Sequence, residues 1–187
     1  MSVLPVTLYG DKILRKKVDK VEEVDIKTIE LIKNMFETMK NSNGIGLAAN
    51  QVGWNKSIFV IDVSPVEGYE NYKPFVAINP QIIELTDETS VYEEGCLSIP
   101  NIKVEIERPK GVILRYYDTD LKEHTLEADD LLARVVQHED DHLLGILFVD
   151  YFSTSQKKKY KNQLNKIRKR DFDAEYPVSE NIEYTLG

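Results

Sequence analysis

Residues 129–145 of the chain read DDLLARVVQHEDDHLLG. This stretch predicts a helix, because an aspartate at 129 or 130 is a good N-terminal cap and apolar residues recur at helical spacing. Gly145 is typical of the position just beyond a helix end. His138 and His142 are four positions apart, so the helix should carry two imidazoles on one face.

The same stretch holds an HExxH pattern, formed by His138, Glu139 and His142. Two imidazoles at this spacing can share one cation, and a glutamate directly after the first lies beside a metal-activated water instead of on the metal. There it can accept a proton and pass it to a leaving group. The plain alternative is a surface helix with two solvated histidines.

A catalytic metal also needs a third protein ligand. One protease arrangement would place a third histidine at position 148, where this chain has Phe148. Another would use a glutamate of the polar C-terminal stretch: Glu175, Glu180 or Glu183. The lone cysteine, Cys96, would complete a His₂Cys site for Zn²⁺ or Fe²⁺. The residues alone leave this open, since free cysteines are more often buried and inert.

Strands are predicted upstream of this helix, with helices flanking them. Asp25 caps a predicted helix over residues 26–40. Apolar runs predict strands at residues 57–63, 75–85, 91–96, 103–108, 111–118 and 121–127. A further helix is expected over about 155–169, and the polar residues 171–187 form a tail that is draped on the surface or mobile. The expected class is α+β, with residues 1–170 as one catalytic domain.

The composition is that of an ordinary globular protein, with 187 residues, 42% of them hydrophobic and 30% charged, and a formal charge of −8. The acidic balance argues against a nucleic-acid binder, so no DNA partner is expected. A single cysteine excludes a disulfide scaffold and fits a reducing compartment. We find neither a secretion signal nor an apolar run of about 18 residues, and therefore expect no membrane segment and a cytoplasmic protein.

Residues 44–51 read GIGLAANQ. The glycines permit tight turning, but no Lys-Ser or Lys-Thr pair follows them, which disfavours a phosphate-binding loop. Taken alone, the segment predicts a helix-to-helix connection with a packing face of small residues.

Three stretches together resemble the motifs of the bacterial peptide deformylase family: GIGLAANQ at 44–51, EGCLSIP at 94–100 and QHEDDHLLG at 137–145. The resemblance covers roughly residues 5–170. It implies antiparallel or mixed sheets packed around a central helix that carries the HExxH motif, with a C-terminal helix. It also implies a metal-dependent hydrolase that removes the formyl group from the N-formylmethionine of newly synthesised proteins and releases formate.

The resemblance assigns three metal ligands to this sequence, Cys96, His138 and His142. It makes Glu139 the general base and then the general acid. Gln51 and the backbone N–H of Leu97 would donate to the formyl oxygen as it becomes an oxyanion. One divalent ion is implied, Fe²⁺ in the cell, with Zn²⁺, Ni²⁺ or Co²⁺ able to occupy the same ligands.

The implied substrates are N-formylmethionyl nascent peptides, which would pair as an added strand with the backbone of Ile45 and Gly46. The methionine pocket is expected to be lined by Leu97, Val135 and the ring face of His138. Arg134 lies one helical turn before His138. It either borders this pocket or forms a salt bridge with a nearby acid such as Asp130.

Three polar residues are assigned no direct chemistry. Asp140 lies nearly opposite the histidine face, so we expect it to be solvated. Asp141 is three positions after His138 and either orients a ligand or serves in a cap or salt bridge. His124 is expected to lie on a surface strand.

Residues 156–170, within the predicted helical segment 153–170, contain eight basic residues and no acid. An apolar stripe of Tyr160, Leu164 and Ile167 could dock this helix on the body. The positive charge either balances an acidic protein or contacts the ribosome, the role that the C-terminal helix has in the family.

Two other functions remain open at the level of the sequence. An HExxH-type metallopeptidase would cleave peptide bonds and would need a third ligand other than Cys96. A deformylase-like binding module would lack activity, although all the residues needed for chemistry are present.

Overall fold

The computed structural model describes residues 2–187. Its helices are α1 (Ile26–Asn41), α2 (Asp130–Leu143) and α3 (Thr154–Arg168), with short 3₁₀ segments η1 (Lys12–Arg15), η2 (Ala49–Val52) and η3 (Phe148–Tyr151). Its strands are β1 (Gly46–Ala48), β2 (Ile58–Ile61), β3 (Phe75–Leu85), β4 (Thr89–Cys96), β5 (Ile99–Pro109), β6 (Gly111–Tyr117) and β7 (Glu123–Asp129). The predicted α+β class is confirmed.

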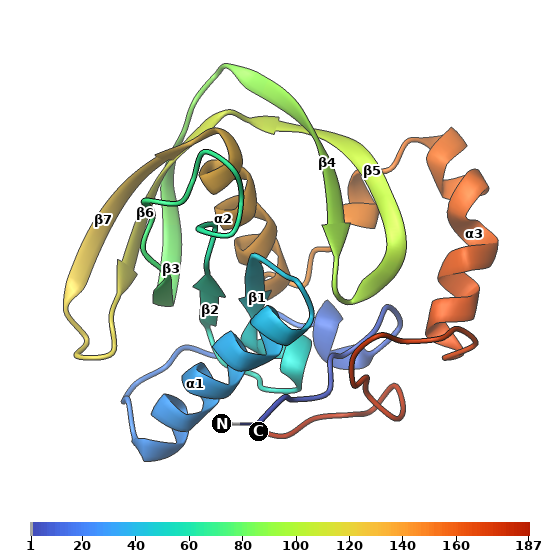
Figure 1. Ribbon diagram of the computed structural model, residues 1–187, viewed down its shortest axis with the longest axis horizontal. Coiled ribbons are helices and arrows are strands. Elements are labelled where there is room, and N and C mark those ends of the chain that lie inside the picture. The colour runs from blue at the N-terminus through green and yellow to red at the C-terminus, as the bar shows by residue number, and fades with distance from the viewer. Residues whose placement is uncertain (1) are drawn as a thin grey trace.

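The strands form two antiparallel sheets (Figure 1). One sheet has five strands in the order β1-β2-β3-β6-β7, and the other is the hairpin β4–β5. The hairpin turn is only two residues long, since Cys96 pairs with Ile99 across it. Because β1 lies at the end of the five-stranded sheet, one of its edges has no strand partner in that sheet.

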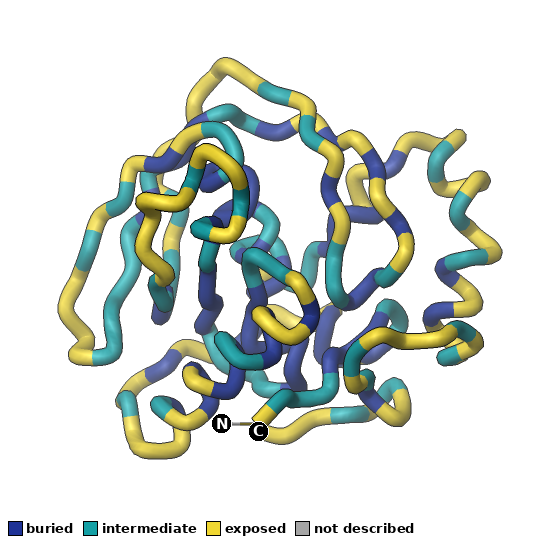
Figure 2. The backbone as a smooth tube through the Cα atoms, in the orientation of Figure 1, coloured by how far each residue is buried: buried dark blue, intermediate teal, exposed yellow. Residues whose placement is uncertain are grey.

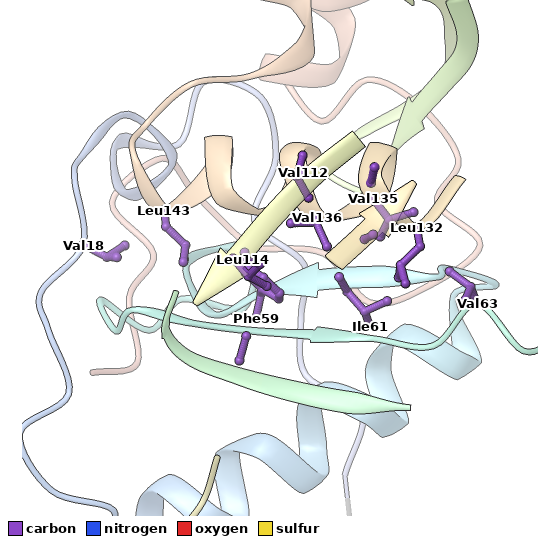
Figure 3. Packing of buried hydrophobic residues seen from close by; sticks show 14 residues of the cluster. Val18, Phe59, Ile61, Val63, Val112, Leu114, Leu132, Val135, Val136 and Leu143 are labelled. Carbon is purple, nitrogen blue, oxygen red and sulfur yellow. The ribbon is translucent and has the colours of Figure 1, made fainter. Parts of the chain in front are cut away.

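Helix α2 lies between the five-stranded sheet and the hairpin, as Figure 1 shows. One face of α2 packs on the five-stranded sheet, and together they form a buried apolar cluster. The helix contributes Leu132, Val136 and Leu143, and the sheet contributes Phe59, Ile61 and Leu114 (Figure 3). This central position buries most of the helix and makes it a rigid support for its side chains.

The end of α2 confirms the predicted stop at Gly145. The Gly145 N–H donates to the His142 carbonyl at 3.1 Å, and the Ile146 N–H donates to the Asp141 carbonyl at 2.9 Å. These two bonds form a Schellman motif, in which Gly145 adopts φ +78°. A side chain at Gly145 would also lie 2.9 Å from the backbone of Arg15, so only glycine fits there.

The other two helices cover the outside of the molecule. Helix α1 packs through Leu31 and Met35 against the opposite face of β2. Helix α3 docks beside β5 through Leu164 and Ile167, and the rest of it is largely exposed (Figure 2). None of the helices within residues 2–187 has both the length and the apolar character needed to cross a membrane.

One sequence-based expectation is wrong in this region. Residues 44–51 are not a helix-to-helix connection, because residues 46–48 form the strand β1, which is paired with β2. The polar residues 171–187 form no helix or strand and are mostly exposed, so they lie along the surface, where several contacts attach them. Val178 forms a β-bridge with Val6, and the Leu186 N–H donates to the Gly53 carbonyl at 2.6 Å.

Candidate active site

The three predicted metal ligands lie together where the hairpin tip meets α2. Cys96 ends β4, and His138 and His142 lie on one face of α2. The Cys96 Sγ is 3.2 Å from the His142 Nε2, and one ligand atom from each of the three residues lies within 4.8 Å of the others. Within residues 2–187, no other group of three or more His, Cys, Asp and Glu side chains lies close enough together to hold a metal ion.

The donor set fits a divalent transition metal. Ligand atoms that surround a tetrahedral ion at about 2.0–2.3 Å are roughly 3.3–3.8 Å apart. The distance of 3.2 Å between the Cys96 Sγ and the His142 Nε2 is close to this range. Two buried polar atoms, the His142 Nδ1 and the Glu139 Oε2, have no hydrogen-bond partner among residues 2–187. A sulfur and two imidazole nitrogens suit Zn²⁺ or Fe²⁺ better than Mg²⁺ or Ca²⁺.

Glu94 fixes the orientation of His138. Its Oε2 is 2.9 Å from the His138 Nδ1, so the ring donates from Nδ1 and leaves Nε2 free to bind a cation. Sequence reasoning missed this residue, although it stands two positions before Cys96. The alternation of a strand could have revealed it, because residues two apart point to the same face.

The pKa values in this cluster follow from burial and from these contacts. Burial would raise the pKa of Glu94, but hydrogen bonds from His138 and Arg108 lower it well below its usual range. Burial, together with the charges of His138 and Arg108, holds the pKa of His142 well below its usual value. His142 is therefore a neutral imidazole, the form that binds metals.

The pKa of His138 moves the other way. Burial would lower it, but hydrogen bonds with Cys96 and Glu94 raise it well above its usual value. These contacts favour positive charge at the Nε2. A metal ion competes with the proton for this nitrogen, so the same contacts also support a bound cation.

A buried network of charges supports Glu94 from below. Arg108 donates to both oxygens of Glu94, at 2.7 and 3.0 Å, and to Asp141 at 2.6 Å. Arg134 donates to Glu94 at 2.8 Å and to the Ser90 carbonyl at 2.6 Å. The arginine side chains and Glu94 are each only 4% exposed. The network therefore ties β4, β5 and α2 together beneath the ligands.

This network answers two questions that the sequence left open. Arg134 forms its salt bridge with Glu94, not with Asp130, and it also borders the cavity described below. Asp141 makes a salt bridge with Arg108 and accepts a hydrogen bond from the Tyr151 hydroxyl at 2.9 Å. It thus acts on His138 only through Arg108 and Glu94.

Glu139 lies beside the ligands on the strand β1 side. A side chain at Gly46 would collide with the Glu139 carboxylate, so the glycine makes room for it. Burial raises the pKa of Glu139 to about 7. A carboxyl group with this pKa can accept and return a proton near neutral pH.

Gln51 and Leu97 border the same space. The Gln51 Nε2 lies 3.4 Å from the Cys96 Sγ and donates to the Ser98 hydroxyl at 3.1 Å. Its Oε1 accepts from the Ala48 N–H at 2.8 Å, which fixes the amide so that the NH₂ group points toward the cysteine. The Gln51 amide and the Leu97 backbone N–H thus lie next to the predicted ligands.

A cavity of about 600 Å³ opens over this group of residues. Each predicted substrate-binding residue lines it: Ile45, Gly46, Leu97, Arg134 and Val135. The catalytic set does so as well, with Gln51, Cys96, His138 and Glu139. Residues 173–176 of the C-terminal segment complete the lining, a contribution that the sequence did not predict.

The remaining predicted residues lie outside the ligand group. Phe148, at the position where one class of protease has its third histidine, is buried and packs against the His138 ring, with 6.1 Å between the ring centroids. It therefore supports the ring by apolar contact and offers no ligand atom. Glu175 lines the cavity but does not join the ligands. His124 lies on β7 and pairs with Asp118 at 2.6 Å, as expected for a strand residue.

The expectation for Asp140 is wrong. Its side chain is partly buried instead of solvated, and burial raises its pKa to about 7. Helical spacing places Asp140 opposite the histidines, but α2 is covered on more than one side, so no face of this part of the helix is fully open to solvent.

Comparisons with known proteins agree with this geometry. Residues 3–158 match the model of a family described as polypeptide deformylase. The chain is 43% identical over 178 residues to the peptide deformylase of Prosthecochloris aestuarii, covering 95% of both chains. It is 44% identical over 176 residues to that of Cytophaga hutchinsonii, covering 93% of this chain and 95% of the other.

A solved structure shows the same arrangement of the backbone. The crystal structure of peptide deformylase from Ehrlichia chaffeensis in complex with actinonin superposes with a TM-score of 0.83. The two sequences are 39% identical, and the match covers 92% of this chain and 100% of that one.

Proposed function

The chain belongs to the polypeptide deformylase family, and from this premise we propose which of its residues carry out the reaction. The enzyme removes the N-formyl group from newly synthesised proteins. The observation that carries the residue assignment is the meeting of Cys96, His138 and His142 beside the buried carboxyl group of Glu139.

Cys96, His138 and His142 hold the divalent metal ion that the family uses. Fe²⁺ is the ion we propose for the cell, and Zn²⁺, Ni²⁺ or Co²⁺ can take the same ligands in a purified sample. When bound, the ion polarises the formyl oxygen and lowers the pKa of a coordinated water toward neutrality. The chain's own residues supply the rest of the chemistry.

Glu139 moves the proton. Its carboxylate takes the proton from the attacking water and then gives it to the departing amine, so that formate and a free N-terminus are produced. The pKa of about 7 suits both directions of transfer. Enclosure beneath Gly46 keeps the carboxyl group at one position while it does so.

Gln51 and Leu97 stabilise the charge that develops on the formyl oxygen. The Gln51 amide and the Leu97 N–H donate to this oxygen from the side of the cavity next to Cys96. The Gln51 amide is in place before the substrate arrives, because the Ala48 N–H and the Ser98 hydroxyl hold it. Preorganised donors of this kind cost no rearrangement during the reaction.

The peptide part of the substrate binds along β1. The edge of β1 that faces away from β2 is available to an extended chain at Ile45 and Gly46. The methionine side chain enters the apolar part of the cavity near Leu97 and Val135. Arg134 borders this pocket from beneath, where its salt bridge with Glu94 neutralises its charge.

The proposal is tested by incubating the metal-loaded enzyme with formyl-Met-Ala-Ser and following the products by mass spectrometry. We expect loss of the formyl group alone, and loss of this activity in Cys96→Ser together with the bound metal. Cleavage of a peptide bond would instead indicate an HExxH-type metallopeptidase. Metallopeptidase activity that survives Cys96→Ser would show that Cys96 is not the third ligand.

We further propose that the basic segment 156–170 contacts the ribosome, which would place the enzyme in the cytoplasm beside emerging chains. Seven of the eight basic residues in this segment are exposed, while Leu164 and Ile167 dock the helix on the body. Phosphate-rich RNA is the natural partner of such a surface. Replacing Lys157, Lys158 and Lys161 with glutamine should weaken co-sedimentation with ribosomes and flatten its salt dependence. Unchanged binding across the salt series would contradict this role.

A further inference from the structure

The C-terminal segment reaches the active site although it lies far from the motifs in sequence. After α3 the chain turns back, and residues 173–176 form one wall of the cavity that Glu139, Cys96 and His138 also line. In Figure 1 this segment runs past the tip of the β4–β5 hairpin. The family match ends at residue 158, before this segment begins.

Both ends of this segment are fixed to the same buried carboxylate. Asp11 is fully buried and accepts hydrogen bonds from Arg170 and from the Ser179 hydroxyl, the latter at 2.5 Å. The Val6 N–H also donates to the Pro177 carbonyl at 2.9 Å. A loop closed in this way has few conformations left to lose, so its inner residues are presented to the cavity in a defined position.

Tyr176 makes the one direct hydrogen bond from this loop to the active-site turn. Its hydroxyl donates to the Leu97 carbonyl at 2.6 Å. Leu97 and Ser98 are the two residues between β4 and β5, and the neighbouring Ser98 carbonyl accepts from the Tyr9 N–H at 2.8 Å. The two carbonyl groups of the turn are therefore each held from outside the hairpin.

Fixing the Leu97 carbonyl restricts the direction of the Leu97 N–H. The two groups belong to successive peptide planes that meet at the Leu97 Cα, so the first plane can rotate less when the second is held. Within residues 2–187 the Leu97 N–H is bonded to no other protein group. It is thus available to the formyl oxygen, provided that the turn keeps its orientation.

We propose that Tyr176 is a positioning residue of this active site, whose hydroxyl holds the Leu97–Ser98 turn so that the Leu97 N–H points at the formyl oxygen. The inference rests on the proposed role of Leu97 as a donor. Tyr176 acts through this backbone group and does not itself touch the reacting atoms. The C-terminal segment is then part of the catalytic apparatus and not an accessory tail.

The test compares Tyr176→Phe with Tyr184→Phe in the metal-loaded enzyme. Tyr184 lies in the same segment and is also partly buried, but it does not line the cavity, so its variant controls for the loss of one hydroxyl. Formate release from formyl-Met-Ala-Ser gives kcat and KM. Calorimetry with the product peptide Met-Ala-Ser gives ground-state binding.

We expect kcat of Tyr176→Phe to fall by about 3–10-fold, a part of the roughly 10²–10³-fold loss that follows complete removal of such a donor. KM and the affinity for the product peptide should stay within about twofold, because only transition-state binding is lost. Tyr184→Phe should match the parent enzyme. Ser179→Ala, which loosens the loop away from the cavity, should lower kcat in the same direction by a smaller factor.

Three results would overturn the proposal. These are an unchanged kcat in Tyr176→Phe, an equal loss in Tyr184→Phe, and a loss confined to KM and product binding. Formate release by the parent enzyme is measured in the same series. Its absence would overturn the proposed chemistry as a whole, whereas a fully active Tyr176→Phe variant would overturn only the role of Tyr176.

Discussion

Helices α2 and α3 have similar lengths but opposite surroundings. Nine residues of α2 are buried, among them Glu139, Arg134 and His142, whereas only Leu164 and Ile167 are buried in α3. Helix α2 lies between the five-stranded sheet and the β4–β5 hairpin (Figure 1), and most of its residues are buried (Figure 2). In α3 nearly all of the charge faces outward.

This difference shows that burial, not helix formation, gives charged residues their chemical properties. Burial raises the pKa of Glu139 to about 7, where it can exchange protons at neutral pH. Burial also makes each charge of α2 dependent on a partner, because an unpaired charge in the interior is costly. The exposed charges of α3 are solvated and depend little on any single neighbour.

The largest effect is expected at Glu139 of α2, the residue proposed to transfer the proton. Glu139→Gln should lower kcat for formate release by about 10²–10⁴-fold, because the amide cannot take up the proton. Metal content and melting temperature should be retained, since glutamine has the same shape. Asp140→Asn is the matched control and should stay close to the parent. Comparable losses in both variants would mean that charge near the ligands matters, and not proton transfer by Glu139.

The next largest effect is expected in the network beneath α2. Arg108→Met removes the partner of Asp141 and two hydrogen bonds of Glu94, and should lower the free energy of unfolding by about 3–5 kcal/mol. Lys158→Met, an exposed change in α3, should stay within about 0.5 kcal/mol of the parent. Urea unfolding monitored by circular dichroism measures both. A small loss in Arg108→Met would show that the network is better solvated than its burial indicates.

For the N-terminal caps we expect the opposite ranking of the two helices, with a larger loss of stability when the cap of α3 is removed than when the cap of α2 is removed. The Ser153 hydroxyl accepts from the Gln156 N–H at 3.2 Å, and the Gln156 side chain accepts from the Ser153 N–H at 2.8 Å, which is a complete capping box for α3. Asp129 makes no such side-chain bond for α2. Ser153→Ala should therefore cost about 1 kcal/mol, and Asp129→Ala less. An equal or larger loss for Asp129→Ala would contradict this ranking.

The smallest effect is expected at Asp150, in the segment that links α2 to α3. Partial burial would raise its pKa, but Arg15 and the Leu147 N–H lower it below the usual value. The stabilisation from this ion pair is present above a pH of about 4 and is lost as the pH falls through the lowered pKa. The difference in melting temperature between the parent and Asp150→Asn should shrink toward pH 2. A difference that is constant over this range would assign the effect to packing.

Much of the fold follows from local sequence signals. Caps and periodicity placed all three helices within about one or two residues of their ends, the usual accuracy of such boundaries. The strand β3 was predicted with its actual limits, 75–85. The strand β1 was missed, because it is only three residues long, carries no periodic signal and becomes a strand only by pairing with β2.

The site shows the same division between local and distant information. The HExxH spacing predicted the two histidines as metal ligands, whereas Cys96 was assigned as the third ligand only through the resemblance to the family. Tyr176 could not be assigned from the sequence, and Glu94 was missed although it lies two positions before Cys96 on the same strand. Glu94 contacts His138, which lies 44 positions later in the sequence, and Tyr176 contacts Leu97, which lies 79 positions earlier. The sequence left open a salt bridge between Arg134 and a nearby acid such as Asp130. The acid in the structure is Glu94, which reaches Arg134 from strand β4.

The bridge between Val6 and Val178 has a consequence for how the protein is made. The two residues are separated by 178 − 6 = 172 positions, so the N-terminal segment has no partner on this side until nearly the whole chain exists. At a synthesis rate of about 5–20 residues per second, this wait lasts roughly 10–30 s. Contacts at such separation also form late when a purified chain refolds, because closing the long loop is entropically expensive. The last part to assemble would then be the loop that carries Tyr176, and catalytic competence would lag behind the formation of the core.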